Sequence, residues 1–360
     1  MIRLLSPATP PTFVTVAHPR AALAARLADL ARFVRHSATE VPLSKHPLWL
    51  DVLRTGLGHE VYALEATASG RTVGFLPLAC VSSMLFGRFL VSLPYLNTNG
   101  VIAHAADVQA ELISRAANLA DELNARHLEL RHETAIAHPS LNAELTSKVH
   151  MRLALPGSDD ALWKGFDAKL RNQLRKGARG GFAVAWGGHE LLDPFYTVLA
   201  ENMRDLGSPV YGKGLFAAIL DAFPGDAELC VLSDGPQPVA AALLLHGWGV
   251  TEVPTASSLR AYNPSNANML MYHHLLLRAV GRGQRTFDFG RSTTDGSTFR
   301  FKKQWGAVPH PAAWQYHTLA GAAGEMRPDN PRYRLAIRTW QRLPVWATRA
   351  LGPLIVRGIP

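Results

Sequence analysis

The stretch FDFGRSTTDGSTFRFKKQWGAVP, residues 287–309, decides the fold class of this 360-residue chain. It opens as a short strand in which Asp288 alternates with Phe287 and Phe289, so the carboxylate points to the opposite face of the strand from the two rings. A polar, glycine-bearing loop follows. Loops at strand ends often carry working residues, because the sheet holds them while the loop leaves them reachable. The sequence therefore predicts a functional site at the end of this strand.

The elements before this strand occur twice along the chain. The second half runs through a helix at 215–223, strands at 227–233, 239–248 and 251–257, a helix at 268–281 and a strand at 286–290. The first half has the same order, with a helix at 46–57, strands at 61–67, 72–81 and 90–95, a helix at 108–126 and a strand at 127–131. Hairpin-linked strands followed by a crossover helix predict an α/β fold with mixed sheets. We expect two copies of one unit, at 1–150 and 151–325, and a separate segment at 326–360.

Composition supports a globular, two-domain protein in the cytoplasm. The chain is longer than a single hydrophobic core usually grows, and 48% of its residues are hydrophobic while 18% are charged. Cys80 and Cys230 each lie in an apolar strand-like run, which favours reduced thiols. The N-terminal apolar run is short and broken by prolines, and no run reaches the ~18 apolar residues of a membrane span.

The net charge of +9 is concentrated in two segments. Residues 164–179 carry +5 and residues 331–360 carry +6, which leaves about −2 for the rest of the chain. A helix predicted around Trp163–Arg179 places Arg171 and Arg175 on one face, opposite an apolar face. Such a charged face is usually only solvated, but here it lies where the two halves join. It is therefore also a candidate surface for a phosphate-rich partner or tRNA.

The predicted order of elements resembles the GNAT acyltransferase fold. Residues 287–309 are similar to FemAB-like proteins, in which a Phe-Lys pair and a Trp-Gly or Phe-Gly follow the fifth strand. Residues 74–101, 170–184 and 332–344 add similarity to the FemAB subgroup associated with exosortase and exopolysaccharide systems, from about Pro42 onward. FemAB enzymes transfer amino acids from aminoacyl-tRNA to the peptide of a peptidoglycan precursor. The resemblance implies two tandem GNAT-like units, a cleft between them, and a transferase that forms an amide bond on an amino group of an envelope or exopolysaccharide precursor.

The family motif suggests roles for residues near the end of the quoted stretch. Lys302 corresponds to the motif lysine and could stabilise an oxyanion or a phosphate, while Phe301 could stack on a terminal base. The alternative is that Phe301 and Trp305 pack in the core and that Lys302 and Lys303 are solvated. We predict Lys302 and Asp288 as catalytic residues, and as substrate-binding residues Phe301, Lys303, Trp305, Arg291 and Ser292. An Asp288–Arg291 ion pair that closes the loop is the structural alternative.

Polar residues in two further loops are candidates for substrate binding. Tyr95, Asn97 and Asn99 follow a strand of the first half, on the side where the resemblance implies acceptor binding; a turn held by asparagine side chains is the alternative. Asn268 ends a loop that opens a helix, where free N–H groups suit an anion, although helix capping explains such residues equally well. GNAT enzymes that use acetyl-CoA usually carry a glycine-rich loop here, and Asn263 and Ser265 stand in its place.

No other chemistry is indicated. The sequence has no GxSxG nucleophile motif, and its fifteen histidines include no HExxH and no Cys/His cluster, so we predict no metal and no bound cofactor. Aminoacyl-tRNA or acyl-CoA would act as the donor substrate. Two alternatives remain: an N-acyltransferase that uses acyl-CoA or an acyl-carrier protein, and a non-catalytic binding protein of the same fold.

The last thirty residues interleave six arginines with apolar side chains and contain no acid. A segment of this kind suits the interface of an anionic membrane, with its tryptophans at headgroup level. We therefore predict a helical, basic tail with a possible peripheral contact at the inner membrane. The alternative is that the tail packs on the second unit and uses its arginines for solubility.

Overall fold

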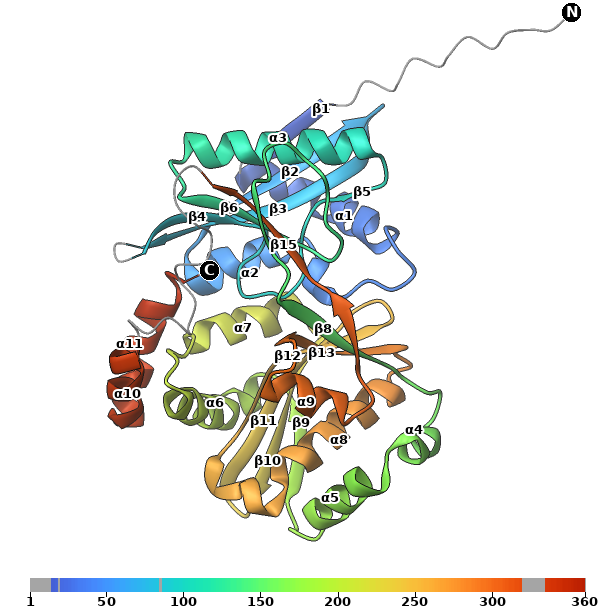
Figure 1. Ribbon diagram of the computed structural model, residues 1–360, viewed down its shortest axis with the longest axis vertical. Helices are drawn as coiled ribbons and strands as arrows, with labels where there is room; N and C mark the ends of the chain where they lie inside the picture. Colours follow the sequence, from blue (N-terminus) through green and yellow to red (C-terminus); the bar gives the residue numbers. More distant parts are fainter. Residues whose placement is uncertain (1–13, 19, 84–85, 319–333, 360) are drawn as a thin grey trace, which may run out of the picture.

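The computed structural model describes residues 14–18, 20–83, 86–318 and 334–359, which form two mixed β-sheets with helices packed around them (Figure 1). The first sheet has the strand order β1-β2-β3-β4-β6-β15-β7, with β5 paired to β3. The second has the order β14-β8-β13-β12-β11-β10-β9. This architecture confirms the predicted fold of two GNAT-like units with mixed sheets.

The first unit follows the predicted order, with additional elements at its start. Its elements are β1 (Val14–His18), α1 (Arg20–Arg35), the 3-10 helix η1 (Leu43–Lys45), α2 (Trp49–Leu57), β2 (Glu60–Ala68), β3 (Arg71–Ser83), β4 (Gly87–Val91), β5 (Ile102–Ala103), α3 (Ala106–Glu122), β6 (His127–His132) and β7 (Ala143–Leu145). In β3, eight consecutive residues from Gly74 to Val81 are buried, because helices cover both faces of the sheet.

The second unit repeats this order. Its elements are β8 (Lys148–Ala154), α4 (Asp159–Gly165), α5 (Ala168–Ala178), β9 (Ala183–Gly187), η2 (His189–Leu191), α6 (Leu192–Leu206), α7 (Lys213–Ala222), β10 (Ala227–Asp234), β11 (Gln237–His246), β12 (Val250–Ser258), η3 (Arg260–Ser265), α8 (Ala267–Gly281), β13 (Thr286–Thr293), α9 (Ser297–Lys303), β14 (Val308–Pro311) and β15 (Ala313–Thr318). Each strand from β9 to β13 occupies the place that β1, β2, β3, β4 or β6 has in the first sheet.

By the order of the repeat, β8 is the last strand of the first copy, as β15 is of the second, and each of these two strands lies in the other copy's sheet. β8 follows β7 in sequence but pairs with β13 and β14 in the second sheet. β15 follows β14 but pairs with β6 and β7 in the first sheet. The sixth place of each sheet is therefore filled by the last strand of the other copy. The expected division at residue 150 runs through β8, and β15 lies in the first sheet although it precedes residue 325.

A close helix crossing joins the units at their centre. Helices α2 and α7, which hold equivalent places in the repeat, pack against each other (Figure 1). A Cβ on Gly56 would lie 2.9 Å from the Cα of Leu215, so only glycine permits this approach. The apolar side chains around the crossing, including Leu53 and Phe216, form one core that extends into both units. This shared core fixes how the two sheets lie relative to each other.

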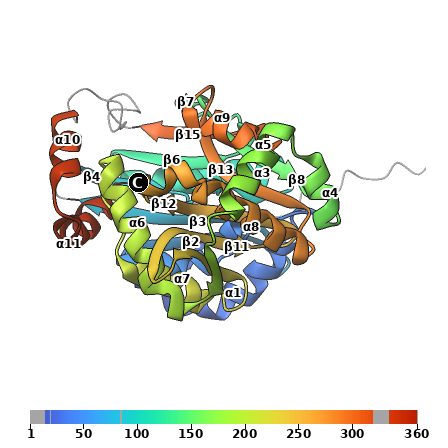
Figure 2. The same ribbon diagram turned by 90° about the horizontal axis from the view of Figure 1, so that it is seen from below.

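The predicted helix over 163–179 is interrupted in the structure. Helix α4 ends at Gly165, and Asp167 then caps α5 by accepting a hydrogen bond from the N–H of Leu170 at 2.6 Å. The two helices pack on α8 (Figure 2), at the end of the second unit that lies away from the first unit (Figure 1). The expectation that this basic segment lies where the two halves meet was therefore wrong, because the chain from β8 runs outward before α4 begins.

The C-terminal tail is helical, as predicted. It forms α10 (Arg334–Arg342) and α11 (Val345–Val356), which both contact α6 of the second unit. Residues 326–333 of the predicted tail lie outside the described residues. No helix in the described part of the chain is long and apolar enough to cross a membrane.

Candidate functional site

The strand β13 leaves its neighbour β12 at the predicted site. The two strands pair in parallel only as far as Glu252 and Asp288, and the pairing of β13 with β8 is irregular between Asp288 and Arg291. Gly290, in this irregular segment, has a φ of +78°, and a Cβ there would lie 3.0 Å from the side-chain nitrogen of Asn97. The backbone of β13 therefore needs glycine at this point to approach the first unit.

Asp288 lies at this junction and does not pair with Arg291. One of its carboxylate oxygens accepts the N–H of Gly290 at 2.7 Å, and the other accepts Nε of Arg152 at 2.8 Å. Arg152 also donates to both oxygens of Glu133, at 3.0 and 2.8 Å. Burial alone would lower the pKa of Arg152, but Glu133 and Asp288 together raise it above its ordinary value. Arg152 thus binds one carboxylate from each unit, Glu133 of the first and Asp288 of the second.

Lys302 is buried beside the same strand. From α9 its Nζ donates to the carbonyl oxygens of Gly290 at 3.0 Å and Arg291 at 2.9 Å. Burial lowers the pKa of Lys302 to about 8, and the charge of Arg291 adds to this while Asp288 opposes it. An ammonium group has three donors, so one N–H of Lys302 is left beyond these two bonds. Lys302 supports the β13 bend, and its charge lies near Asp288.

Glu252 is a further buried acid that sequence reasoning missed. It lies on β12 opposite Asp288, is 8% exposed, and accepts the N–H of Ser44 at 2.9 Å. Burial and, to a smaller extent, the charge of Asp288 together raise the pKa of Glu252 to about 7. A carboxyl group with a pKa near the operating pH is suited to accept a proton. Glu252 is the one charged residue of β12, between Thr251 and Val253, and a charged residue inside a strand was the signal that could have revealed it.

A narrow cavity lies beside Glu252 and Asp288. It is lined by residues of both units: Leu96, Asn97, Leu245, Glu252, Val253, Pro254, Asp288 and Gly290. Its volume of about 10 Å³ is close to the smallest space that holds one water molecule. The structure therefore brings Asp288 and Asn97 together, in a space that is closed to a substrate as it stands.

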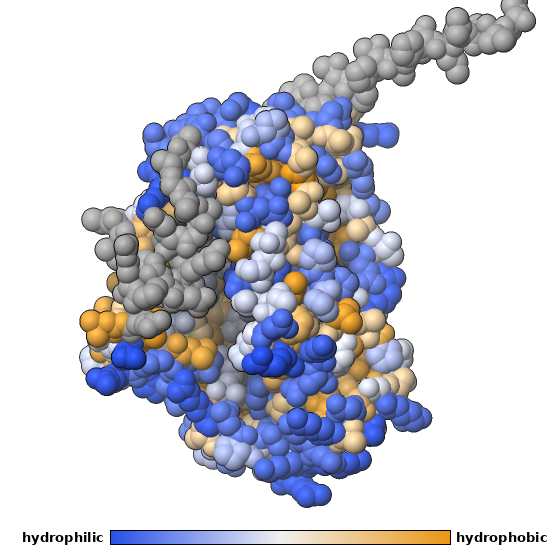
Figure 3. All heavy atoms as spheres, in the orientation of Figure 1, coloured by the Kyte–Doolittle hydropathy of each residue, from blue (hydrophilic) through white to orange (hydrophobic). Residues whose placement is uncertain are grey.

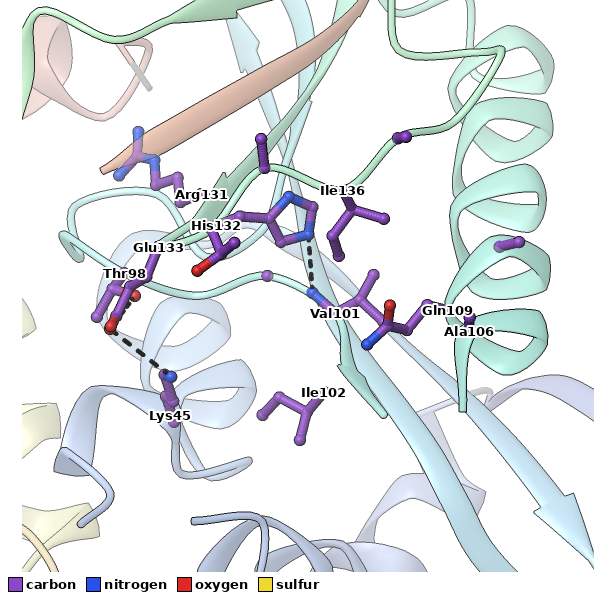
Figure 4. Close-up of a pocket in the computed structure, with 15 residues that line it drawn as sticks. Lys45, Thr98, Val101, Ile102, Ala106, Gln109, Arg131, His132, Glu133 and Ile136 are labelled. Atoms are coloured by element: carbon purple, nitrogen blue, oxygen red, sulfur yellow. Dashed lines mark hydrogen bonds and ion pairs between the residues drawn. The ribbon is translucent and has the colours of Figure 1, made fainter. Parts of the chain in front are cut away.

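A much larger pocket, of about 560 Å³, lies in the first unit (Figure 4). It opens between the loop after β4, the end of β6 and the start of α3. Lys45 and Glu133 point toward each other across its edge, with 3.8 Å between Nζ and a carboxylate oxygen. His132 accepts the N–H of Val101 at 3.2 Å, and burial lowers the pKa of His132 to about 4. Because Glu133 lines this pocket and also binds Arg152, a row of charged side chains links the pocket to the narrow cavity.

Arg291 lies between the two units, against the exchanged strand β15. Its guanidinium lies 3.9 Å from the ring centre of Trp314, and that of Arg131 lies 4.1 Å from the same ring. Arg131 also binds Glu129, at 2.6 Å, whereas the guanidinium of Arg291 makes no hydrogen bond or ion pair with a described residue. Burial lowers the pKa of Arg291 to about 10, and the charge of Arg131 adds to this. Such an unpaired guanidinium is suited to bind an anionic group.

The three predicted residues of the first unit lie around these cavities. Asn97 accepts the indole N–H of Trp314 through its carbonyl oxygen at 3.3 Å. Asn99 is fully buried and donates to the carbonyl oxygen of Ser44 at 2.7 Å, which holds η1 in place. Tyr95 donates its hydroxyl proton to the carbonyl oxygen of Arg357 at 3.0 Å. Asn97 alone of the three lines a cavity.

The remaining predicted residues lie elsewhere. Trp305 is 2% exposed, and Phe301 packs against Tyr272 with 5.0 Å between ring centres, so both belong to the core of the second unit. Ser292 is buried, Lys303 is exposed, and Asn268 is half-buried in the first turn of α8. Arg171 donates to the carbonyl oxygen of Phe166 and Arg175 donates to Asn172, both on the far side of the second unit.

Comparisons with known proteins agree with this architecture. Residues 164–303 match a family model described as an acetyltransferase (GNAT) domain. The described fold is similar to the solved structure of FemX, with a TM-score of 0.63 and 14% identity over 86% of this chain and 98% of that one. No curated protein matches the sequence.

Two further solved structures are similar to almost the whole chain. One is L-PGS from Bacillus licheniformis, with a TM-score of 0.55 and 13% identity over 88% of this chain and 97% of that one. The other is a tandem GNAT protein from the clavulanic acid biosynthesis pathway, with a TM-score of 0.53 and 11% identity over 87% of this chain and 100% of that one. The chain therefore has a tandem GNAT-like fold, and its residues 164–303 are similar to the GNAT acetyltransferase domain family.

Proposed function

We propose that this protein is an amide-forming acyltransferase whose reaction centre lies between β12 and β13, at Glu252, Asp288 and Lys302. The observation that carries the proposal is the buried Glu252 carboxyl, whose pKa is raised to about 7 by burial and by Asp288, at the point where the two strands separate. The match of this unit to an acetyltransferase domain supports a transferase.

The proposed reaction is a direct transfer. The amine nitrogen of the acceptor attacks the carbonyl carbon of an activated ester or thioester, so a C–N bond forms and the C–O or C–S bond breaks. Glu252 accepts the proton of the amine, which then passes to the leaving oxygen or sulfur. The free N–H of Lys302 donates to the developing oxyanion. No covalent enzyme intermediate is needed.

The large pocket of the first unit is the proposed acceptor site. It leads through Glu133 and Arg152 to Asp288, and Arg291 offers an unpaired cation for a phosphate or carboxylate of the acceptor. The reacting groups enter the narrow cavity when the loop after β4 moves. This loop holds Leu93 and Tyr95 at φ values of +55° and +72°, which are unfavourable for residues other than glycine. Relief of this strain would favour opening.

The finer proposal is that an aminoacyl group is transferred to an amine of a cell-envelope or exopolysaccharide precursor. It rests on the FemAB resemblance of residues 287–309, and the similarity in fold to FemX and L-PGS is consistent with it. Aminoacyl-tRNA would be the donor. Donor contacts on the outer surface of the second unit would come from Lys303, Arg171 and Arg175. A donor contact from Phe301 would require the second unit to rearrange, because this ring packs on the core.

The second candidate is an acyl-CoA-dependent N-acyltransferase, favoured by the acetyltransferase type of residues 164–303. Against it, the start of α8, where a GNAT pyrophosphate would bind, is covered. Ala267 is fully buried, and a Cβ on Gly177 of α5 would lie 3.1 Å from the carbonyl oxygen of Asn266.

The test offers the purified chain both donors with the same acceptor. Labelled aminoacyl-tRNA or acetyl-CoA is incubated with a nucleotide-linked peptide precursor, and amide product is measured for the wild type and Glu252→Gln. We expect product with aminoacyl-tRNA, and a loss of about 10²–10⁴-fold in Glu252→Gln, the usual contribution of a general base. Glu144→Gln, which changes an exposed acid on β7, is the control and should match the wild type. Equal rates for Glu252→Gln and wild type would remove Glu252 from the reaction.

A further inference from the structure

The helix α11 exposes an apolar face to solvent. Its opposite face is buried on the second unit: Thr348, Gly352 and Val356 are covered, and a Cβ on Gly352 would lie 2.9 Å from the backbone of Val210. The sequence alternative that the tail packs on the second unit is therefore correct for this face. Arg349 also lies over the ring of Tyr196, with 5.1 Å to the ring centre, whereas the side of α11 opposite Gly352 faces solvent.

The exposed face is continuous along the helix. Trp346 is 74% exposed, Leu351 47% and Leu354 65%, and Ala350 lies between them on the same side. Their spacing of three, four and eight residues puts them on one stripe of the helix. Figure 3 shows hydrophobic residues gathered at the surface where α11 lies. A helix that is apolar on nearly all sides is normally buried, so we expect another apolar surface to cover the exposed half of α11.

Every charged residue of α10 and α11 is an arginine. Arg338 and Arg342 are exposed on α10, and Arg357 is exposed just after α11. The whole segment 331–360 carries six arginines and neither Asp nor Glu. A protein partner of mixed charge would not need this bias, whereas an anionic lipid surface attracts every one of these cations. Exposed tryptophan next to arginine is the composition of a helix that lies in the plane of a membrane interface.

We propose that α10 and α11 attach the protein to the surface of an anionic lipid bilayer, with the α11 stripe of Trp346, Ala350, Leu351 and Leu354 inserted among the headgroups and the arginines bound to lipid phosphates. The attachment is independent of the proposed transfer reaction. The tail also contacts the first unit, because Tyr95, in the loop that leads to Asn97, donates a hydrogen bond to the carbonyl oxygen of Arg357. The attached tail is thus in direct contact with a loop of the candidate site.

The test is co-sedimentation of the full chain with vesicles of phosphatidylglycerol and phosphatidylcholine, or of phosphatidylcholine alone, at low and at physiological salt. We expect binding only to the anionic vesicles, weakened by salt because exposed charges are screened over ~8 Å at 0.15 M. The variant Arg338→Gln/Arg342→Gln should bind roughly 30-fold more weakly, which corresponds to about 1 kcal/mol for each arginine. The variant Trp346→Ala/Leu354→Ala should also lose binding, while both keep the wild-type unfolding midpoint.

Two controls separate this attachment from its alternatives. Val308→Ala changes another exposed apolar residue, on β14, and Arg32→Gln changes an exposed arginine on α1; both should bind like the wild type. Sedimentation equilibrium reports whether α11 instead joins two copies of the chain. A dimer that dissociates in Trp346→Ala/Leu354→Ala, or vesicle binding that ignores lipid charge, would overturn the proposal.

Discussion

The strands of each sheet separate at the same place in the two units, but the two spaces that result differ. In the first unit, β4 and β6 pair in parallel at Leu90 and Val91 and then diverge beside a pocket of about 560 Å³. In the second, β12 and β13 diverge after Glu252 around a cavity of about 10 Å³. The first space has room and the second has buried titratable groups. The difference is consistent with our proposal that the first copy binds the acceptor and the second carries the chemistry.

The start of the crossover helix shows the same contrast. In the first unit, Ala106, Gln109 and Ala110 at the start of α3 line the large pocket. In the second unit, α5 covers the start of α8 and Ala267 is fully buried. The additional helices of the second unit therefore close the space that the first unit leaves open. Arg152 connects the two spaces, because it lies on the exchanged strand β8 and binds a carboxylate from each unit.

The largest effect is expected for Arg152→Met, which breaks this connection. The change leaves the buried Asp288 without an ion-pair partner and Glu133 with Lys45 alone, and removal of one partner from a buried ion pair typically costs about 3–5 kcal/mol. Urea denaturation of the variant and the wild type measures the loss of unfolding free energy. Arg285→Gln removes an exposed pair with Glu40 and should cost less than about 1 kcal/mol. Equal losses in the two variants would show that the connection has no special importance.

A smaller and pH-dependent effect is expected for Lys302→Met. The pKa of Lys302 is lowered to about 8 in the folded state, so between pH 8 and its ordinary value near 10.5 the unfolded chain binds a proton that the folded chain has released. The wild type should therefore gain stability relative to the variant as pH rises through this range, by up to about 3 kcal/mol at 1.36 kcal/mol per pKa unit.

Denaturation at several pH values from 7 to 10.5 measures this difference between wild type and Lys302→Met. Lys303→Met, at the neighbouring exposed position, is the control and should show a constant difference from the wild type. A difference for Lys302→Met that does not change with pH would mean that its ammonium group is not desolvated in solution.

The smallest effect on stability is expected for Ala110→Leu, which places a larger side chain in the large pocket and so reduces its volume. Half-exposed helix positions of this kind usually change stability by less than ~0.5 kcal/mol. If acceptor binds in the first unit, the variant should raise the acceptor KM severalfold and leave kcat close to that of the wild type. Steady-state kinetics with the acceptor measure both values. Ala178→Leu, at the exposed end of α5, should change neither, and an unchanged KM in Ala110→Leu would place the acceptor elsewhere.

Local patterns in the sequence predicted the units but not how they are joined. The alternation of helix, hairpin and crossover helix follows from apolar periodicity within each segment, and the structure has these elements in the predicted order. The exchange of β8 and β15 leaves no local signal, because the partners of a strand are chosen by contacts far away in sequence. The break before α5 had a signal in Asp167, a typical capping residue, which the apolar face of 162–174 obscured.

The residues of the candidate site were likewise predicted only in part, because some of them come together only in the folded chain. Asp288 and Lys302 were found from the strand end and from the family motif, and the structure places both at the junction of the units. Glu252 and Arg152 are single polar residues inside strands, and only the folded chain shows that they face Asp288. Phe301 and Trp305 belong to the same motif but pack in the core, since aromatic residues in a short helix serve packing as readily as binding.

The exchange of strands also has a consequence for synthesis of the chain on the ribosome. His132 on β6 and Gln315 on β15 hydrogen bond at 2.9 Å across 183 positions of sequence. At ~5–20 residues per second, the nascent first unit waits roughly 10–40 s for the strand that completes its sheet. During this time the edge of β6 has no partner on that side, and such an edge can pair with another chain. We therefore expect the emerging first half to depend on chaperones, and a fragment that ends before residue 313 to aggregate.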